Sequence, residues 1–141
     1  MRIMKISKHI TYDEATLSPT AIRNGISNQP NEQQLHNMQQ LAENIFEPLR
    51  KMYGKPIKIN SFFRSAKLNK LVGGSPTSQH TKGQAIDITT GTKSENKKLF
   101  ELAKTLEFDQ LIWEYGDYTG PHWVHISYKT SGNRKQILII K

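Results

Sequence analysis

The chain has 141 residues, of which 35% are hydrophobic, and a formal net charge of +8 at pH 7. This length suits one domain with one core, and no apolar run approaches the roughly 20 residues of a membrane span. The absence of cysteine excludes disulfides and thiolate zinc sites. The first nine residues lack the apolar core of a signal peptide. The lysines are scattered and form no known nucleic-acid-binding module, so we expect neither membrane insertion nor a nucleic-acid partner.

The N-terminal third of the chain predicts irregular structure followed by one long helix. Residues 11–30 are rich in Ser, Thr, Pro, Asn and Gly, so we expect at most one short helical turn there, at 19–24. Asn31 is suited to cap a helix, because a glutamine follows at the capping-box position. Apolar residues at helical spacing then predict a helix over roughly 32–51, with a bend at Pro48.

The rest of the chain predicts short strands and two further helices. Ser65 is suited to cap a short helix that ends before Gly73, and Ser94 is suited to cap a helix with Leu99 on its inner face. Apolar and β-branched runs predict strands over 57–63, 84–90, 111–115, 123–128 and 136–140. We therefore expect a single compact α+β domain over residues 1–141, with a small, mainly antiparallel sheet, helices on one side and a metal site on the other face.

Two short segments contain the residues that we expect to bind metal. His80 and Asp87 lie in the segment 78–87, and His125 lies in the segment 123–126. In the predicted strands, alternation directs Asp87 and His125 away from their isoleucine and valine neighbours, which face the core. Two antiparallel neighbours can present these side chains together, and His80 can fold over the same face from the preceding loop.

Two imidazoles and one carboxylate are three ligands for a zinc ion, and the open fourth position is typical of catalytic sites. Taken singly, these residues have other interpretations. A histidine in a polar loop is usually a surface residue, and an aspartate or histidine in an apolar strand can be satisfied by hydrogen bonds. The pattern alone leaves these alternatives open beside metal binding.

The same residues carry a resemblance to a known family. The family pattern is Ser-x-His-x6-Asp followed by a distant Trp-x-His, and four residues match it: Ser78, His80, Asp87 and His125. The chain thereby resembles the zinc-dependent peptidoglycan peptidases related to D-Ala-D-Ala carboxypeptidase and L-alanyl-D-glutamate endopeptidase. The segments 60–65 and 108–114 are also similar to the family, and the similarity covers nearly the whole chain.

The resemblance implies a role for each matching residue. His80, Asp87 and His125 would bind one zinc ion per chain. Arg64 resembles the arginine that holds a substrate carboxylate or carbonyl, a task that suits its planar, two-pronged guanidinium. Ser78 resembles a hydroxyl that supports the ligands or binds substrate.

The general base departs from the family pattern. Many relatives place a Glu or Asp three residues before the last histidine, where this chain has His122. If residues 115–121 form a hairpin loop, Glu114 and His122 lie roughly opposite one another. We favour Glu114 as the base, with His122 as a transition-state donor or alternative base. An exposed hairpin carboxylate is the other interpretation of Glu114.

The resemblance implies a hydrolase that cleaves an amide bond in the D-amino-acid-containing stem peptides of bacterial peptidoglycan. Both a carboxypeptidase and a phage-type endolysin fit this activity. We expect the protein to act on the cell wall as a monomer. The alternative is a non-catalytic, zinc-containing binding module on the same fold.

Overall fold

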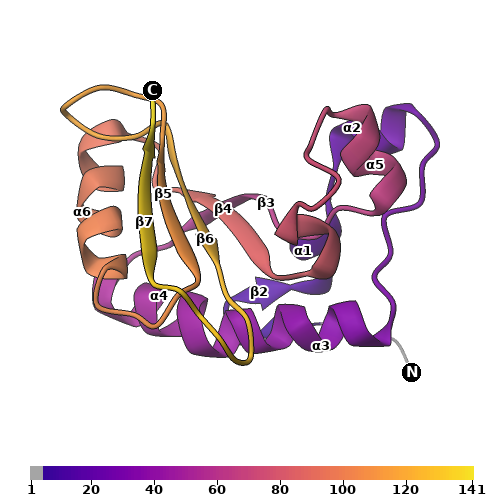
Figure 1. Cartoon of the computed structure of the whole chain (residues 1–141), viewed down its shortest axis with the longest axis horizontal. Helices are drawn as coiled ribbons and strands as arrows, with labels where there is room; N and C mark the ends of the chain where they lie inside the picture. Colours follow the sequence, from indigo (N-terminus) through magenta and orange to yellow (C-terminus); the bar gives the residue numbers. More distant parts are fainter. Residues whose placement is uncertain (1–4) are drawn as a thin grey trace.

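The computed structural model describes residues 5–141. Residues 1–4 belong to the nine in which no signal peptide was predicted, and they lie outside the described part. Two antiparallel strands, β1 (Lys5–Ser7) and β2 (Ile10–Thr11), form a small sheet. The main sheet has five strands in the order β3-β4-β6-β5-β7 (Figure 1). Their bounds are Lys58–Ser61 for β3, Ala85–Thr89 for β4, Gln110–Glu114 for β5, Trp123–Ser127 for β6 and Gln136–Ile140 for β7. Only the β5–β7 pair is parallel among these neighbours, which confirms a mainly antiparallel α+β fold.

The helices gather in two places around this sheet. Helices α4 and α6 lie beside one face, whereas α1, α2 and α5 lie together beyond β3 (Figure 1). Their bounds are Tyr12–Thr16 for α1, Pro19–Arg23 for α2, Glu32–Leu41 for α3, Glu47–Tyr53 for α4, Ala66–Leu71 for α5 and Lys93–Ala103 for α6. Within residues 5–141, no helix is long and apolar enough to cross a membrane.

Two N-terminal elements differ from the prediction of irregular structure over residues 11–30. The last residue of the strand β2 and the whole of the helix α1 fall there. Thr11 caps α1 in a capping box, because its hydroxyl accepts from the Glu14 amide and the Glu14 carboxylate accepts from the Thr11 amide. This Thr-x-x-Glu signal is present in the sequence, but no apolar periodicity follows it. The expected turn near 19–24 is α2.

The long helix begins where it was predicted and changes its hydrogen bonding before Pro48. Asn31 and Gln34 form the expected capping box of α3. Between α3 and α4, residues Ala42–Phe46 form the π-helical turn η1, in which the Glu47 amide donates to the Ala42 carbonyl. Pro48 has no amide hydrogen to donate, and a wider turn is one way a helix accommodates such a loss. The sequence predicted a bend at the proline and not this change in the turn before it.

The cap of α6 was predicted wrongly. Thr92 caps the helix in place of Ser94, which lies inside the first turn. The Thr92 backbone is extended and its hydroxyl accepts from the Glu95 amide at 3.3 Å. Glu95 follows Thr92 at the capping-box spacing of three residues, a signal that favours Thr92 and not Ser94 as the cap. The expected inner face is confirmed for Leu99, which is fully buried.

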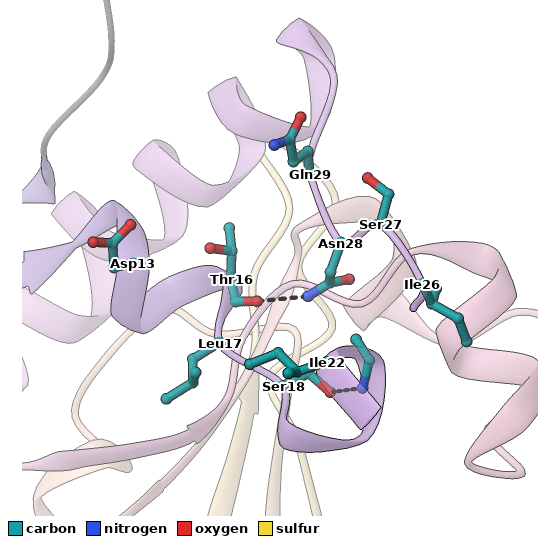
Figure 2. Close-up of a pocket in the computed structure, with 10 residues that line it drawn as sticks. Asp13, Thr16, Leu17, Ser18, Ile22, Ile26, Ser27, Asn28 and Gln29 are labelled. Atoms are coloured by element: carbon teal, nitrogen blue, oxygen red, sulfur yellow. Dashed lines mark hydrogen bonds between the residues drawn. The ribbon is translucent and has the colours of Figure 1, made fainter. Parts of the chain in front are cut away.

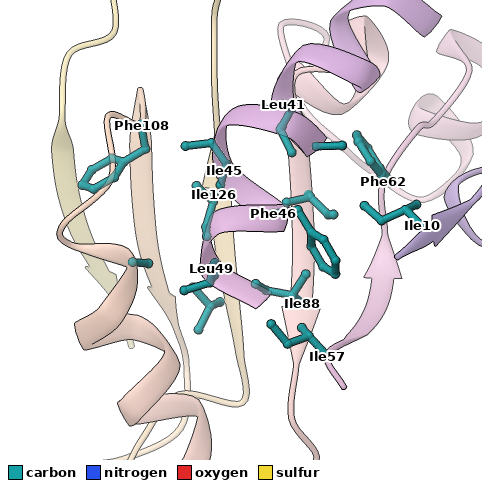
Figure 3. Packing of buried hydrophobic residues seen from close by; sticks show 14 of the residues in the cluster. Ile10, Leu41, Ile45, Phe46, Leu49, Ile57, Phe62, Ile88, Phe108 and Ile126 are labelled. Atoms are coloured by element: carbon teal, nitrogen blue, oxygen red, sulfur yellow. The ribbon is translucent and has the colours of Figure 1, made fainter. Parts of the chain in front are cut away.

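The core lies between the helices and one face of the sheet. Figure 3 shows side chains of η1 and α4, such as Ile45 and Leu49, in one cluster with Ile88 of β4 and Ile126 of β6. Each fully buried side chain of this size contributes about 1.5–3 kcal/mol. Because successive strand residues point to opposite faces, burial of each isoleucine directs the residues next to it in its strand to the other face of the sheet.

Candidate metal centre

Asp87 and His125 are direct cross-strand partners. The register of β4 and β6 pairs their Cα atoms, as strand alternation predicted. His125 Nδ1 lies 2.8 Å from Asp87 Oδ1, and both side chains are partly exposed. The antiparallel pair therefore presents an imidazole and a carboxylate side by side on the face opposite the core.

His80 reaches the same carboxylate from a loop. It lies in the 3-10 turn η2 (Gln79–Lys82), and only 2% of the residue is exposed. His80 Nε2 is 3.2 Å from Asp87 Oδ2, and its ring meets the His125 ring edge to face at 5.3 Å. The three predicted ligands are thus brought together, with their ligand atoms all within 4.8 Å of one another.

The hydrogen bonding of His80 prepares it to bind a cation. Its Nδ1 lies 2.8 Å from the Phe62 carbonyl oxygen, which can only accept, so Nδ1 carries the proton. In a neutral ring Nε2 then has a lone pair, and that lone pair faces a carboxylate oxygen of Asp87. Two acceptors at this distance repel unless Nε2 is protonated or a cation lies between them. Metal-binding histidines commonly donate their other ring hydrogen to a carbonyl in this way.

The charge of Asp87 suits the same role. Burial by itself raises the pKa of Asp87, but the adjacent His125 and His80 rings outweigh it and hold the pKa well below its usual range. The carboxylate is therefore ionised at neutral pH. Two imidazoles and one carboxylate are a donor set that zinc and other divalent metals accept. Within residues 5–141 they are the one group of three such side chains placed to share a metal ion.

Helix α3 holds the loop that carries His80. Gln34 Nε2 donates to the Thr81 carbonyl at 3.1 Å, and Asn37 Nδ2 donates to the Lys82 carbonyl at 2.9 Å. Gly83 has a φ of +73°, and a Cβ there would lie 2.5 Å from the Gln34 carbonyl oxygen. The glycine therefore allows the loop to pack closely against α3.

Ser78 connects the metal loop to Arg64. Its hydroxyl caps η2 by accepting from the His80 amide at 3.3 Å, and it lies 3.5 Å from Arg64 Nη2. The Arg64 amide in turn donates to the His80 carbonyl at 3.2 Å. Burial lowers the pKa of Arg64, while the negative charge of Asp87 raises it. The predicted substrate residue Arg64 thus lies within electrostatic range of the predicted ligand Asp87.

Asn28 was not among the predicted site residues, yet it orients the backbone on both sides of Arg64. Asn28 Nδ2 donates to the Phe63 carbonyl at 3.0 Å, and Asn28 Oδ1 accepts from the Ser65 amide at 2.7 Å. The same Nδ2 donates to the Thr16 carbonyl at 2.9 Å, an interaction drawn in Figure 2. An asparagine in a polar segment carries no local signal for this role, because its partners are up to 37 residues away.

A hollow beside Asn28 contains no predicted site residue. It has a volume of about 340 Å³ and lies between α1, α2 and the segment 26–29 (Figure 2). Its wall includes Leu17 and Ile22, which are exposed. None of the three predicted ligands lines it. The hollow is therefore separate from the candidate metal centre.

Glu114 and His122 lie one residue out of the expected register. Glu114 pairs with Trp123, and the His122 amide donates to the Glu114 carbonyl at 3.0 Å. Trp123 shares the face of His125, so its partner Glu114 lies on the face of the metal ligands too. His122 is exposed and precedes β6, where alternation favours the opposite face. The backbone of His122 instead contacts α6, because Asn96 Nδ2 donates to its carbonyl at 3.0 Å.

The environment of Glu114 is typical of an acid–base group. Burial raises the pKa of Glu114, a shift that the charge of His125 opposes and the charge of Asp87 reinforces. A carboxylate whose pKa is raised by burial holds a proton more readily than an ordinary one, which suits a group that accepts and returns a proton. Glu114 is half-buried, which does not fit the alternative of an exposed hairpin carboxylate.

Three converging candidate ligands with a carboxylate on the same face are an arrangement that metal-dependent hydrolases use. A family model described as Peptidase M15 matches residues 8–127, which include every residue of this site. The chain therefore belongs to the peptidase M15 family, as its motifs predicted, and this is a family of metallopeptidases. Comparison with curated proteins finds no match.

Proposed function

We propose that the protein is a zinc-dependent peptidase that hydrolyses an amide bond in the D-amino-acid-containing stem peptides of bacterial peptidoglycan. The observation that carries this proposal is the His80–Asp87–His125 group, in which the Nε2 lone pair of His80 faces a carboxylate across a gap that a cation would fill. The family match supports the peptidase class. The net charge of +8 suits an anionic cell wall as the site of action.

His80, Asp87 and His125 would hold the zinc ion. When bound, zinc lowers the pKa of a coordinated water and polarises a carbonyl oxygen. The two neutral imidazoles and single carboxylate leave a net positive charge on such a site, which favours the negative charge that develops in amide hydrolysis. The donor set contains no fourth ligand among the described residues, so a position remains for water or substrate.

Glu114 is the proposed general base. It lies on the face of the ligands, and its raised pKa suits transfer of a proton from the attacking water to the leaving amine. His122 is the second candidate, either as a donor to the developing negative charge or as the base itself. The register favours Glu114, because His122 precedes the strand and its backbone contacts α6.

Arg64 is the proposed substrate clamp, with Ser78 beside it. Arg64 Nε is buried and has no hydrogen-bond partner among the described residues. A buried guanidinium nitrogen without a partner is costly, and a substrate carboxylate or carbonyl would satisfy it. Ser78 can share that contact, since its hydroxyl lies 3.5 Å from Arg64 Nη2.

Two measurements on purified protein test the proposal. The zinc content is determined by mass spectrometry of the metal for the wild type and for His125→Ala, with His36→Ala as the control, since His36 is exposed on α3. We expect one zinc per chain in the wild type and the control, and none in His125→Ala.

Digested peptidoglycan is then analysed by mass spectrometry, with and without a chelator. Chelator-sensitive cleavage identifies the bond and separates a carboxypeptidase from an endopeptidase, whereas full zinc in His125→Ala would refute the ligand assignment. Zinc binding without any cleavage would refute the peptidase in favour of a binding module.

A further inference from the structure

Two aromatic side chains stand beside Glu114, outside the roles assigned so far. Tyr115 follows Glu114 directly, and Trp123 is the cross-strand partner of Glu114. The Tyr115 and Trp123 rings are 5.4 Å apart and tilted by 53°. Trp123 also lies two residues before His125 on the same strand, and so on the same face of the sheet. The pair, which we call the aromatic wall, therefore borders the candidate metal centre.

The backbone of Tyr115 adopts a conformation that its residue type disfavours. Its φ is +58°, in the left-handed region that Gly, Asn and Asp adopt most readily. Such a conformation persists only where the surroundings hold it, and it is frequent at functional sites. The Tyr115 amide donates to the Ile140 carbonyl at 2.7 Å, which joins the end of β5 to the end of β7.

The loop after Tyr115 is held against α6. Asp117 accepts from Lys93 Nζ at 2.6 Å and forms a bridge with Gly120. Gly120 packs so closely on the backbone of Lys93 that a Cβ there would clash with the Lys93 carbonyl. Asn96 Nδ2 donates to the Pro121 carbonyl at 3.1 Å. These contacts fix the loop that follows Tyr115.

Tyr115 also lines a hollow of about 500 Å³ whose wall includes the C-terminal residue Lys141. Most of the hollow's lining is apolar, and its other members include Trp113, Tyr118, Ile139 and Ile140. Tyr115 is 44% exposed, so its ring is accessible to a ligand. Aromatic rings bury aliphatic groups with little loss of side-chain entropy, which makes them effective contact surfaces.

We infer that Tyr115 is a specificity-determining residue, which together with Trp123 contacts the substrate residue on the Glu114 side of the reacting amide. The occupant is the aliphatic part of a peptide side chain, which extends from the metal centre along the aromatic wall towards the hollow. This inference rests on the proposed peptidase function, because it places the peptide at the metal centre. It adds a contact on the side of the site opposite Arg64, which belongs to the segment after β3 at the far edge of the sheet.

The test compares Tyr115→Asn with matched controls on purified stem peptides. Asparagine tolerates a positive φ, so this variant removes the ring and keeps the backbone. Lys135→Asn is the control for the backbone, since Lys135 is the other described non-glycine residue with positive φ, at +49°. We expect Tyr115→Asn to raise KM about tenfold with kcat within about twofold and zinc content unchanged, whereas Tyr115→Phe and Lys135→Asn keep the wild-type KM.

The outcomes separate this inference from the proposed function. An active wild type whose KM is the same in Tyr115→Asn overturns the aromatic wall alone. Loss of zinc or of thermal stability in Tyr115→Asn, together with the KM change, shows a structural role and also overturns it. If the wild type does not cleave the peptides, their Kd is measured by calorimetry for the same variants. Weaker binding to Tyr115→Asn then supports the aromatic wall without catalysis, and equal binding or no binding overturns it.

Discussion

Asn28 orients the backbone around Arg64 by hydrogen bonds to the two residues that flank it. The Asn28 amide group donates to the residue before Arg64 and accepts from the residue after it. The Arg64 amide donates to the His80 carbonyl, and the Phe62 carbonyl accepts from the His80 ring. A single backbone segment thus links the proposed substrate clamp to a proposed metal ligand.

Replacing Asn28 should therefore affect both stability and substrate use. In Asn28→Asp the acceptor for Ser65 is retained, but the donors to Thr16 and Phe63 are lost and the carboxylate faces two carbonyl oxygens. Leaving buried groups unsatisfied costs about 1–3 kcal/mol each. We expect the free energy of unfolding, measured by urea denaturation, to fall by about 1–3 kcal/mol. KM should rise in the protein that remains folded. Asn44→Asp is the control, because Asn44 bonds only within its own helix turn. Wild-type stability in Asn28→Asp would show that these hydrogen bonds do not hold the segment.

Arg64→Lys should impair substrate use while leaving zinc in place. Lysine keeps the charge but loses the two-pronged geometry of the guanidinium. A hydrogen bond between charged groups contributes about 1.5–3 kcal/mol, so we expect kcat/KM to fall about 10- to 100-fold on a wall peptide. The exposed Arg23 of α2 provides the control variant Arg23→Lys. If the two variants have equal kinetics, Arg64 is not a substrate clamp.

Glu114→Gln and His122→Ala distinguish the two candidate bases. Glutamine is nearly isosteric with glutamate but cannot accept the proton of the attacking water. Removing a general base typically lowers the rate about 10²- to 10⁴-fold, so we expect Glu114→Gln to keep its fold and zinc and to lose activity. His122→Ala should lose less. The reverse order, with an active Glu114→Gln and an inactive His122→Ala, would identify His122 as the base.

Asp109 should contribute stability that is lost in acid. It is fully buried, its carboxylate accepts from Arg134 Nε and Nη2 at 3.0 and 2.9 Å, and these hydrogen bonds lower its pKa to about 2. Because the folded pKa lies below the ordinary value of 3.8, the stabilisation is present above about pH 4 and is lost as the pH falls towards 2. We expect it to be about 1–2 kcal/mol, since the Arg134 side chain is 54% exposed and therefore screened.

The measurement is urea denaturation between pH 7 and 2. Asp109→Asn should be less stable than the wild type at pH 7 and should lose less stability on acidification. The exposed Glu107, which pairs with Lys135 at 3.3 Å, provides the control Glu107→Gln. Equal acid dependence in Asp109→Asn and the wild type would show that Asp109 does not account for the effect.

Local patterns in the sequence were sufficient to predict which side chains meet at the candidate metal centre. Alternation in two apolar strands placed Asp87 and His125 on the face away from the core, and the register of β4 and β6 confirms it. The capping box at Asn31 was likewise readable, because a cap involves residues three apart. The caps of α1 and α6 show where such reasoning was incomplete, since no apolar periodicity follows Thr11, and Ser94 competes with Thr92 as the start of α6.

Only the tertiary structure determined the surroundings of these ligands. The partner of Glu114 is Trp123 and not His122, because the register of a hairpin depends on its loop, and here Tyr115 and Gly116 both have positive φ. The link from Asn28 to the residues around Arg64 spans more than 30 residues of sequence. Alternation and capping act over a few residues and leave a pattern in the sequence, whereas hydrogen bonds between distant segments form only once the core has brought those segments together.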